Sequence, residues 1–279
     1  HLISSNTHDN ILFFTDRGRA FQTKVWEIPQ ASRTAKGKPI HNFLEIPIEE
    51  KVNAIVSYPE NKEDKTSRYL VMLTARGIIK KTALEDFKNV RRTGIIALKL
   101  KRGDFLRWVK MSSGMDEAVI TTARGQSIRF KESQIRAMGR AAGGVRAIRL
   151  KKDDAVSSMD LLKAQKSELS AKGGSASGGK NQKLLVVMAN GYGKQTPIAQ
   201  YRIQRRGGSG IKTAKITSKT GQLVAAHVIS GEEEIIALSA KGQIIRTKLG
   251  AVRVAGRATQ GVKIMGLNSG DKVVGVICL

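Results

Sequence analysis

Cysteine and histidine are scarce in this chain of 279 residues, and each shortage excludes a class of protein. The single cysteine, Cys278, rules out a disulfide framework. The four histidines are scattered without metal-ligand spacing, so we expect no metal site. No residue pattern resembles a nucleophile elbow or a dinucleotide fingerprint, and no apolar run is long enough to span a membrane. We find no signal peptide. The single cysteine fits a reducing cytoplasm, and the lack of a catalytic motif leads us to expect a binding module with no catalytic residues.

Acidic residues are also few. The chain has 49 Lys and Arg against 23 Asp and Glu, a formal net charge of +26 that is spread along the whole sequence. Such an excess predicts a polyanionic partner, and nucleic acid is the leading candidate. The alternative is a basic surface that serves solubility alone. We disfavour it because the charges recur at equivalent positions of a repeat.

The repeat is a degenerate unit that occurs five times, and each copy opens with an apolar run that ends at a glycine. The openings are ILFFTDRG (11–18), LVMLTARG (70–77), AVITTARG (118–125), LLVVMANG (184–191) and IIALSAKG (235–242). A second glycine follows 19 residues after the first in four copies and 17 residues after it in the copy at 70–77. Such periodicity predicts one supersecondary unit stacked or wound around an axis.

Each unit reads as four strands. The apolar run is the first strand, and the glycine turn leads into an alternating second strand. We expect the third strands to begin at the second glycine, at 37–44, 94–100, 144–150, 210–216 and 261–267. We expect the fourth at 52–58, 105–111, 155–161, 222–228 and 272–278, and one short helix near 132–138. Four-stranded units around an axis predict an all-β, propeller-like fold.

We expect a single domain over 1–279, with five complete repeats. Their bounds are about 7–58, 66–111, 116–162, 183–229 and 232–279. Residues 1–6 fit a truncated blade, because LISSN (2–6) resembles the fourth strand of a preceding unit, so we expect one more blade upstream. Residues 163–182 are rich in Gly, Ser and Lys and predict a flexible inserted loop.

Basic residues precede the second glycine of every copy, which predicts a charged stripe on the assembled fold. QRRGGSG (204–210) is the sharpest of these connections. Its glycines let the backbone approach a phosphate, and its guanidinium groups can grip phosphate oxygens. A solvated turn is the alternative at each connection. The candidate DNA-binding residues are Gln204, Arg205, Arg206, Gly207, Gly208, Ser209, Gly210, Lys212, Arg33, Lys36, Lys38, Arg91, Arg92, Arg136, Arg140, Arg146, Arg253, Arg257 and Lys263.

Basic residues of the second strands leave two interpretations open, DNA contact or ordinary outward-facing positions. They are Lys80, Lys81, Arg129, Lys131, Lys194, Arg246 and Lys248.

The basic connections suit a duplex better than a single strand. Single strands are usually held by aromatic stacking, whereas aromatic residues are 5% of this chain and none lies within the basic loops. No recognition helix for the major groove is evident. Basic loops spaced around a rim can contact a duplex backbone and offset the cost of bending, which is roughly 1–6 kcal/mol for 40–90°.

Four segments carry a resemblance to a known family. They are NTHDNILFFTDRGRAFQTKVWEIPQASRTAKG (6–37), SIRFKESQIRAMGRAAGGVRAIRL (127–150), ANGYGKQTPIAQY (189–201) and GRATQGVKIMGL (256–267). With them the whole chain resembles the C-terminal domain of the bacterial DNA gyrase A protein. The resemblance implies a six-bladed β-pinwheel, in which neighbouring blades exchange strands, that wraps duplex DNA with a positive crossing. The enzyme then adds negative supercoils with ATP.

The family's gyrase-A box has the form Q-R-R-G-G-x-G and normally lies in the first blade. Here residues 204–210 match it in the fourth complete unit. Either an upstream blade holds the usual box and this is a second one, or the box function has moved.

The resemblance also implies the domain's partners. They are double-stranded DNA, the rest of the gyrase A protein and the gyrase B protein, with no membrane, and the isolated domain is expected to be monomeric, cytoplasmic and associated with the chromosome. It needs no cofactor, since ATP and Mg²⁺ serve other parts of the enzyme, and it is not itself an enzyme. The alternatives are the equivalent domain of topoisomerase IV and, from another class, a propeller scaffold that binds protein partners.

Overall fold

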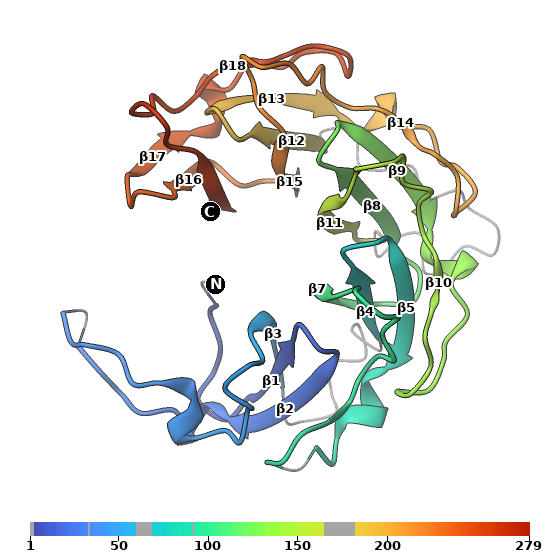
Figure 1. The fold of residues 1–279 in the computed structure, drawn as a ribbon, viewed down its shortest axis with the longest axis vertical. Coiled ribbons are helices and arrows are strands. Elements are labelled where there is room, and N and C mark those ends of the chain that lie inside the picture. Colours follow the sequence, from blue (N-terminus) through green and yellow to red (C-terminus); the bar gives the residue numbers. More distant parts are fainter. Residues whose placement is uncertain (1–2, 33, 60–68, 91, 165–181) are drawn as a thin grey trace. The chain divides into compact units, whose positions relative to one another are not determined.

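The computed structural model describes residues 3–32, 34–59, 69–90, 92–164 and 182–279. Strands and short 3-10 helices are all of the regular structure in these ranges, which contain no α-helix (Figure 1). None of the helices there is long and apolar enough to cross a membrane. The all-β class predicted from the repeat is confirmed. Most of the loop expected at 163–182 lies outside the described residues.

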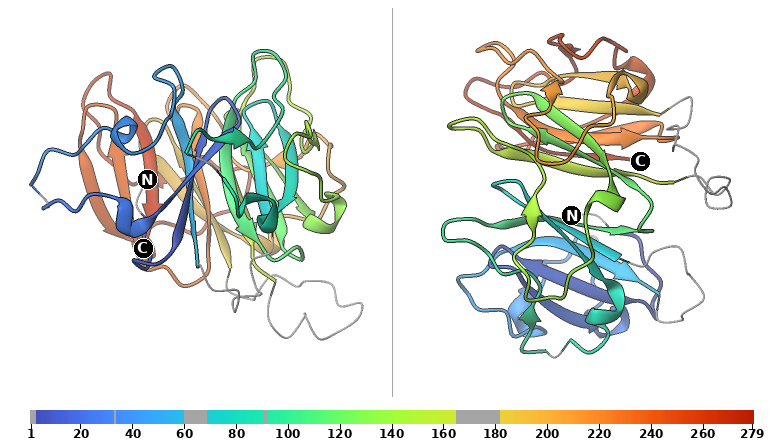
Figure 2. Two further views of the ribbon diagram at one scale, coloured as in Figure 1. Left: turned by 90° about the horizontal axis from the view of Figure 1, so that it is seen from below. Right: turned by 90° about the vertical axis from the view of Figure 1, so that its right-hand side faces the viewer.

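Five antiparallel sheets follow one another along the chain, and each of the first four borrows a two-residue strand from the next repeat. Figure 2 shows the sheets from the side, with turns and connections at the strand ends. The sheets are β3-β1-β2-β6, β10-β5-β4-β7, β11-β8-β9-β14, β15-β12-β13-β18 and β17-β16-β19. The long strands are β1 Asn10–Thr15, β2 Arg19–Lys24, β3 Val52–Tyr58, β4 Tyr69–Thr74, β5 Ile78–Ala83, β7 Leu106–Ser112, β8 Glu117–Thr122, β9 Gln126–Lys131, β11 Val156–Leu162, β12 Lys183–Met188, β13 Tyr192–Pro197, β15 Leu223–Ile229, β16 Glu234–Ser239, β17 Ile244–Lys248 and β19 Val273–Cys278. The borrowed strands are β6 Ile95–Ile96, β10 Val145–Arg146, β14 Ile211–Lys212 and β18 Val262–Lys263.

The turn between the first two strands is the same in every repeat. Each turn glycine has a positive φ, from 76° at Gly125 to 85° at Gly242. The amide of Gly191 donates to the carbonyl of Met188 at 3.0 Å, and the other four turns repeat this bond. The hairpins predicted from the glycine turns are therefore confirmed, as are the five fourth strands, whose observed bounds differ from the predicted ones by at most one residue.

The predicted third strands were wrong in length. Only two residues pair with the preceding sheet, as in Tyr192↔Lys263 and Gly193↔Val262. The ladder ends there because the next two amides, of Ile264 and Met265, both turn to the carbonyl of Gly191 at 2.8 and 3.1 Å. In the first repeat, residues 37–44 form no strand and contain the 3-10 helix η2 (Ile40–Asn42).

The second glycine is what allows the borrowed strand to approach the preceding sheet. At Gly261 φ is +78°, and a Cβ there would lie 2.4 Å from the carbonyl oxygen of Gly193. Gly144 is similar, since its φ is +77° and a Cβ there would lie 2.7 Å from the carbonyl oxygen of Ile79. Any side chain at these positions would collide with backbone. Gly37 lies in open space, in keeping with the absence of a strand there.

The predicted helix near 132–138 is only the 3-10 helix η4 (Glu132–Gln134). The others are η1 Val25–Glu27, η3 Leu84–Phe87, η5 Ile198–Gln200 and η6 Leu249–Ala251.

Residues 3–6, expected in a truncated blade, form no strand. The Asp9 carboxylate accepts hydrogen bonds from the Ser5 hydroxyl and the Asn6 amide, both at 2.9 Å, and so closes a turn instead.

The chain divides into two compact units, His1–Gly114 with Ile135–Val145 and Met115–Gln134 with Arg146–Leu279. In the first unit, a buried cluster that includes Leu12 and Leu70 joins its two sheets. In the second, one cluster that includes Val119 and Leu184 joins the third and fourth sheets. Another joins the fourth and fifth. Whether the chain is one continuous domain stays a prediction.

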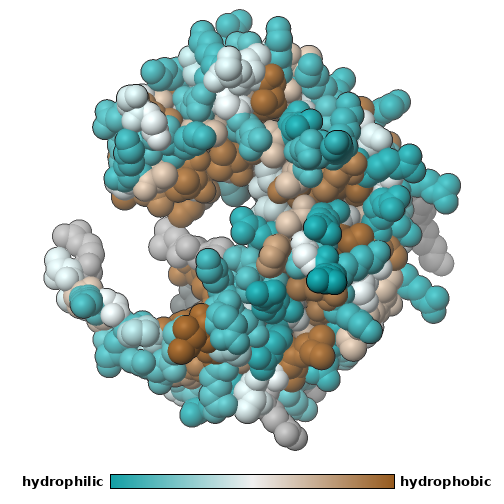
Figure 3. Space-filling model, viewed as in Figure 1, coloured by the Kyte–Doolittle hydropathy of each residue, from teal (hydrophilic) through white to brown (hydrophobic). Residues whose placement is uncertain are grey.

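The fifth sheet has three strands, because no later repeat among the described residues supplies a fourth. Its apolar side chains are correspondingly exposed, with Ile244 at 65%, Val274 at 53% and Leu238 at 40%. Figure 3 shows the resulting hydrophobic area over β16 and its neighbours.

Candidate nucleic-acid interface

The basic side chains of the predicted site reach solvent wherever the structure describes them. Arg33 and Arg91 lie outside the described residues. The exposed basic candidates are Lys36, Lys38, Arg92, Arg136, Arg146, Arg205, Lys212, Arg253 and Lys263. The half-buried ones are Arg140, Arg206 and Arg257. Of the other box residues, Gly208 and Ser209 are exposed, and Gln204, Gly207 and Gly210 are half-buried.

The borrowed strands align three of the cations. Arg146, Lys212 and Lys263 are each the second residue of a borrowed strand, and each is exposed. Since the borrowed strand is the edge of its sheet, these cations stand on the edges of the second, third and fourth sheets. Equivalent basic residues follow three positions later in two of these repeats, at Arg149 and Lys215, and are also exposed.

Three further exposed cations lie at equivalent positions but are not among the predicted residues, namely Lys99, Arg149 and Lys215. The signal was present, because each lies five residues after a second glycine. The predicted strand alternation did not separate them from ordinary surface residues.

The two arginines of QRRGGSG have different surroundings. Arg205 is exposed, and its side chain makes no hydrogen bond or ion pair within the described part of the chain. Arg206 is half-buried, and its Nε and Nη1 donate to the carbonyl oxygens of Gln134 and Arg146 at 2.9 and 3.1 Å. The sequence suggested two equivalent guanidinium groups. In the ranges that the structure describes, the Arg205 guanidinium is free, whereas the Arg206 guanidinium holds the loop in place.

Gln134 is a second residue that the sequence did not reveal. Its side-chain amide accepts a hydrogen bond from the Arg206 amide at 2.8 Å and donates to the carbonyl of Gln204 at 3.1 Å. The loop also pairs with the third repeat through Gly207 N to Ala147 O, at 2.6 Å. The residues on either side of the two arginines, Gln204 and Gly207, are thus both held by hydrogen bonds to their backbone groups.

The brace recurs in the last repeat. Arg257 Nη1 donates to the carbonyl of Lys212 at 3.2 Å, as Arg206 does to the carbonyl of Arg146. Lys212 and Arg146 hold equivalent places on their borrowed strands, so Arg257 and Arg206 are equivalent residues and Arg205 is the additional one. A guanidinium has five N–H donors, so each brace leaves donors available to a ligand.

Four of the second-strand cations are buried, which removes them from the DNA-contact alternative. Lys80 and Lys194 have no exposed surface, and Arg129 and Lys81 are 5% and 6% exposed. Lys131 is half-buried, and Arg246 and Lys248 are exposed. The outward-facing interpretation also fails for the buried four, since the next repeat covers the second strand.

The two fully buried lysines bind the next repeat's basic loop. Lys80 Nζ donates to the carbonyl oxygens of Ala97 at 2.6 Å and Gly139 at 2.9 Å, and to that of Arg140. Burial lowers the pKa of Lys80 to about 8, with Asp86 opposing this shift and Arg140 adding to it.

Lys194 repeats this arrangement in the fourth blade. Its Nζ donates to the carbonyl oxygens of Gly256 and Arg257, both at 2.6 Å, and to Thr259 Oγ1 at 3.1 Å. Burial, together with the positive charge of Arg257, lowers its pKa to about 8.

The fourth residue after the turn glycine, one position beyond that of the buried lysines, binds the 3-10 helix that precedes the next basic loop in the third and fourth blades. Arg129 Nη1 donates to the carbonyl oxygens of Ile198 and Tyr201, both at 3.1 Å, and Arg129 Nε pairs with Glu117 at 2.6 Å. In the following blade the equivalent Gln195 donates to the carbonyl oxygens of Leu249 and Val252.

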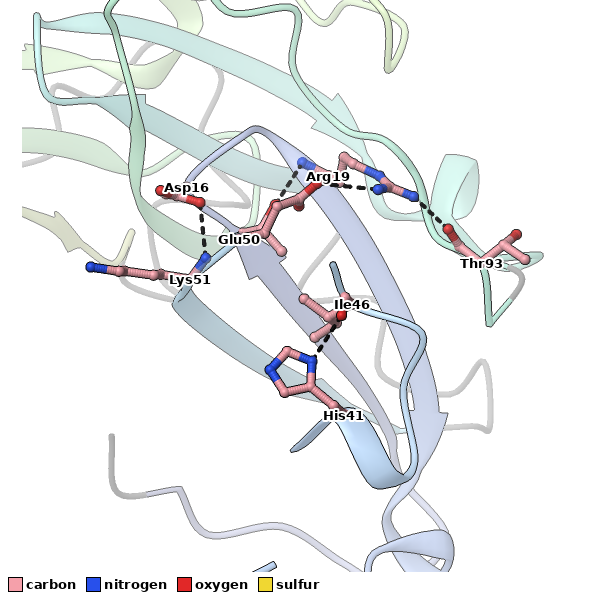
Figure 4. A network of polar contacts seen from close by, with 8 residues as sticks. Asp16, Arg19, His41, Ile46, Glu50, Lys51 and Thr93 are labelled. Carbon is pink, nitrogen blue, oxygen red and sulfur yellow. Dashed lines mark hydrogen bonds and ion pairs between the residues drawn. The ribbon is translucent and has the colours of Figure 1, made fainter. Parts of the chain in front are cut away.

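The first blade uses a different cation for the same purpose. Figure 4 shows Arg19 between Glu50, at 3.1 Å, and the carbonyl of Thr93, at 2.6 Å. A side chain of each of the first four blades therefore binds backbone carbonyls in the connection that follows. Among the described residues no three potential ligands of a metal ion come together.

Comparisons with known proteins agree with this architecture. A family model described as "DNA gyrase C-terminal domain, beta-propeller" matches residues 9–43, 68–113, 116–163, 182–230 and 233–279. The chain is 39% identical over 294 residues to the DNA gyrase A protein of Synechocystis sp., covering 99% of this chain and 34% of that protein. It is 37% identical over 274 residues to the DNA gyrase A protein of Staphylococcus epidermidis, covering 98% and 29%. The chain thus spans about a third of the length of these curated relatives.

Two solved structures share the fold. The C-terminal domain of DNA topoisomerase IV superimposes with a TM-score of 0.83 at 23% identity, covering 99% of this chain and 80% of that one. The DNA gyrase A C-terminal domain gives 0.79 at 24% identity, covering 98% and 83%. At these identities the likeness shows the fold and nothing finer.

Proposed function

The chain belongs to the DNA gyrase C-terminal domain, beta-propeller family, and from that premise we propose that it binds duplex DNA on its basic connections and wraps it. In this proposal the domain serves a topoisomerase that introduces negative supercoils with ATP. The domain itself contributes no catalytic residue and takes no cofactor. Its partners are the DNA, the remaining parts of the gyrase A protein and the gyrase B protein, in the cytoplasm.

The observation that carries the proposal is the recurrence of exposed cations at one structural position. Arg146, Lys212 and Lys263 stand on successive sheet edges, and the loop before each strand carries a further arginine. Phosphates recur regularly along a duplex, so cations that recur from blade to blade can follow its backbone. No aromatic platform or recognition helix accompanies them in the described part of the chain, and the contacts therefore carry little sequence preference.

The chemistry of each contact is electrostatic. An exposed guanidinium such as that of Arg205 donates a fork of hydrogen bonds to phosphate oxygens, while its loop is held in place from below. In this proposal the DNA bends so that it contacts several blades of the propeller at once.

A salt titration on two unrelated duplexes tests the binding. Each neutralised phosphate contributes about −0.9 to the slope of log K against log salt, so several contacts give a steep slope that is equal for both sequences. Energy transfer between dyes on the two ends of a linear duplex tests the wrapping, since the ends approach when the DNA bends.

Two outcomes would contradict the proposal. A flat salt slope would favour the alternative of a scaffold that binds protein partners. A steep slope with unchanged end-to-end distance would leave binding intact and exclude wrapping.

A further inference from the structure

Two of the basic loops rest on a fully buried lysine. Lys80 and Lys194 are each the third residue after their turn glycine, and each donates to two consecutive carbonyls of the next repeat's basic loop. We propose that Lys80 and Lys194 are positioning residues for DNA binding, each fixing the backbone from which Arg140 or Arg257 reaches a phosphate. This inference rests on the proposed function.

The number of acceptors matches the number of donors. An ammonium has three N–H groups, and each of these lysines has three oxygen partners on the polypeptide. Two of the three are consecutive carbonyls, Gly139 with Arg140 or Gly256 with Arg257. Binding consecutive carbonyls fixes the two peptide planes on either side of the arginine Cα, and with them the direction in which the arginine side chain leaves the backbone.

The third blade shows that burial of this position does not require a lysine. Ile128 occupies the equivalent place and is fully buried. The loop above it is QRRGGSG, in which a Cβ at Gly208 would lie 3.7 Å from Ile128 Cδ1. That loop is held by Gln134 instead. The chain therefore holds its basic loops in more than one way, and the lysine is used where the loop reads Gly-Arg-Ala.

Stability alone does not account for the lysines. Removing an ammonium from water is costly, and an apolar residue of suitable size often replaces a buried charge without loss of stability. The arginine beside each lysine adds a like charge, which raises the cost. Desolvation and the nearby arginine both disfavour a charged lysine at this place. We therefore explain the lysine by the basic loop whose carbonyls it binds.

The test uses the 279-residue chain with Lys194→Ile, a substitution that copies the third blade, and Lys183→Met, which removes one charge from a first strand. Without DNA, hydrogen exchange at residues 255–261 should accelerate in Lys194→Ile and not in Lys183→Met. With DNA, at a temperature where the variant is fully folded, Lys194→Ile should lower the salt slope by about 0.9, one phosphate contact. Lys80→Ile should do the same through residues 138–143. The temperature is chosen in this way because Lys194→Ile leaves the carbonyl oxygens of Gly256 and Arg257 without a donor, which lowers stability.

A double-mutant cycle separates positioning from a direct effect of charge. If Lys194 acts through Arg257, Lys194→Ile combined with Arg257→Ala should bind DNA no more weakly than Arg257→Ala alone. Additive losses, or unchanged exchange at 255–261, would overturn the inference. No DNA binding by the unmodified chain would overturn the proposed function itself, and the exchange data would still show whether the lysine holds the loop.

The pH profile is a further readout. Above pH 8 an ammonium becomes an amine with two N–H groups, and one of its three oxygen partners is left without a donor. Asp86 and Arg140 face Lys80, and Arg257 faces Lys194. DNA binding should weaken between pH 7 and 9 in the unmodified chain and stay flat in the Lys80→Ile, Lys194→Ile variant. Equal profiles would contradict the role of the two lysines.

Discussion

Lys194 Nζ lies 2.6 Å from the carbonyl oxygen of Arg257, so a buried cation holds the backbone of a second cation in the next repeat. Like charges repel, yet here the lysine binds the negative end of the peptide dipole of Arg257, while the Arg257 guanidinium donates to the carbonyl of Lys212. This relationship links the fold to the proposed binding, and it makes both sensitive to the same few residues.

The first prediction concerns the pH dependence of stability. Burial lowers the pKa of Lys80 and Lys194 to about 8 in the folded state, from 10.5. Between these pH values the unfolded chain binds more protons than the folded chain, so the contribution of the two lysines to stability rises with pH. Denaturant unfolding at pH 7.5 and 9.5 should show a larger gain for the unmodified chain than for Lys80→Ile, Lys194→Ile. An equal gain in both proteins would mean that the pKa values of Lys80 and Lys194 are not lowered on folding.

The second prediction compares one ion pair in two environments. Arg129 with Glu117 and Arg246 with Glu234 are equivalent pairs on the third and fifth sheets. The side chains of the first pair are 6% and 4% exposed, and those of the second are 66% and 27% exposed. Removing one partner of a buried pair leaves an uncompensated charge, so Arg129→Met should cost about 3–5 kcal/mol of unfolding free energy.

Arg246→Met is the matched control, since exposed pairs contribute at most about 1 kcal/mol. Arg129→Met also strands the carbonyls of Ile198 and Tyr201, which adds to its effect. Denaturant midpoints of the two variants measure the contrast. Similar midpoints would mean that burial does not strengthen this pair.

The third prediction tests the borrowed strand. A Cβ at Gly261 would lie 2.4 Å from a backbone oxygen at a φ of +78°, so Gly261→Ala should destabilise the chain by about 1–3 kcal/mol and detach β18. Gly266→Ala, where a Cβ would meet nothing within 4 Å, should have little effect. Thermal unfolding of the two variants gives the comparison, and equal melting temperatures would show that the close approach is not required.

Much of the fold was predictable because its signals are local. The apolar run and the glycine fix each hairpin within eight residues, as in LLVVMANG, and the fourth strands follow from alternation. The borrowed strand was not predictable from the residues, because it pairs with a neighbouring repeat. Only the resemblance to a family implied the exchange. The length of that strand depends on where two amides turn to Gly191, which no sequence pattern reports.

The sequence predicted where the basic connections lie, but it did not predict what each basic side chain does. Periodic basic residues located the connections, but a lysine in an alternating strand looks like a surface residue until the next repeat covers it, as at Lys194. Likewise two adjacent arginines look equivalent until the partners of Arg206 are known. Gln134 has no signal at all, since it lies 70 residues before the loop that it holds.

The last prediction separates the two arginines of QRRGGSG. Arg205 is exposed and makes no hydrogen bond or ion pair within the described ranges, so Arg205→Ala should reduce the salt slope by about 0.9 and leave the melting temperature unchanged. Arg206 donates to Gln134 and Arg146, so Arg206→Ala should loosen the loop and lower both stability and affinity. The equivalent Arg257→Ala is the control for loss of a bracing arginine.

The comparison also decides whether this loop is a distinct box. If wrapping depends on the additional arginine, Arg205→Ala should reduce end-to-end energy transfer on a long duplex more than Arg257→Ala does. The reason is that Arg205 has all five donors available, whereas Arg257 uses one for its brace. Equal losses would make QRRGGSG one basic loop among several, and an unchanged salt slope in Arg205→Ala would remove it from the DNA path.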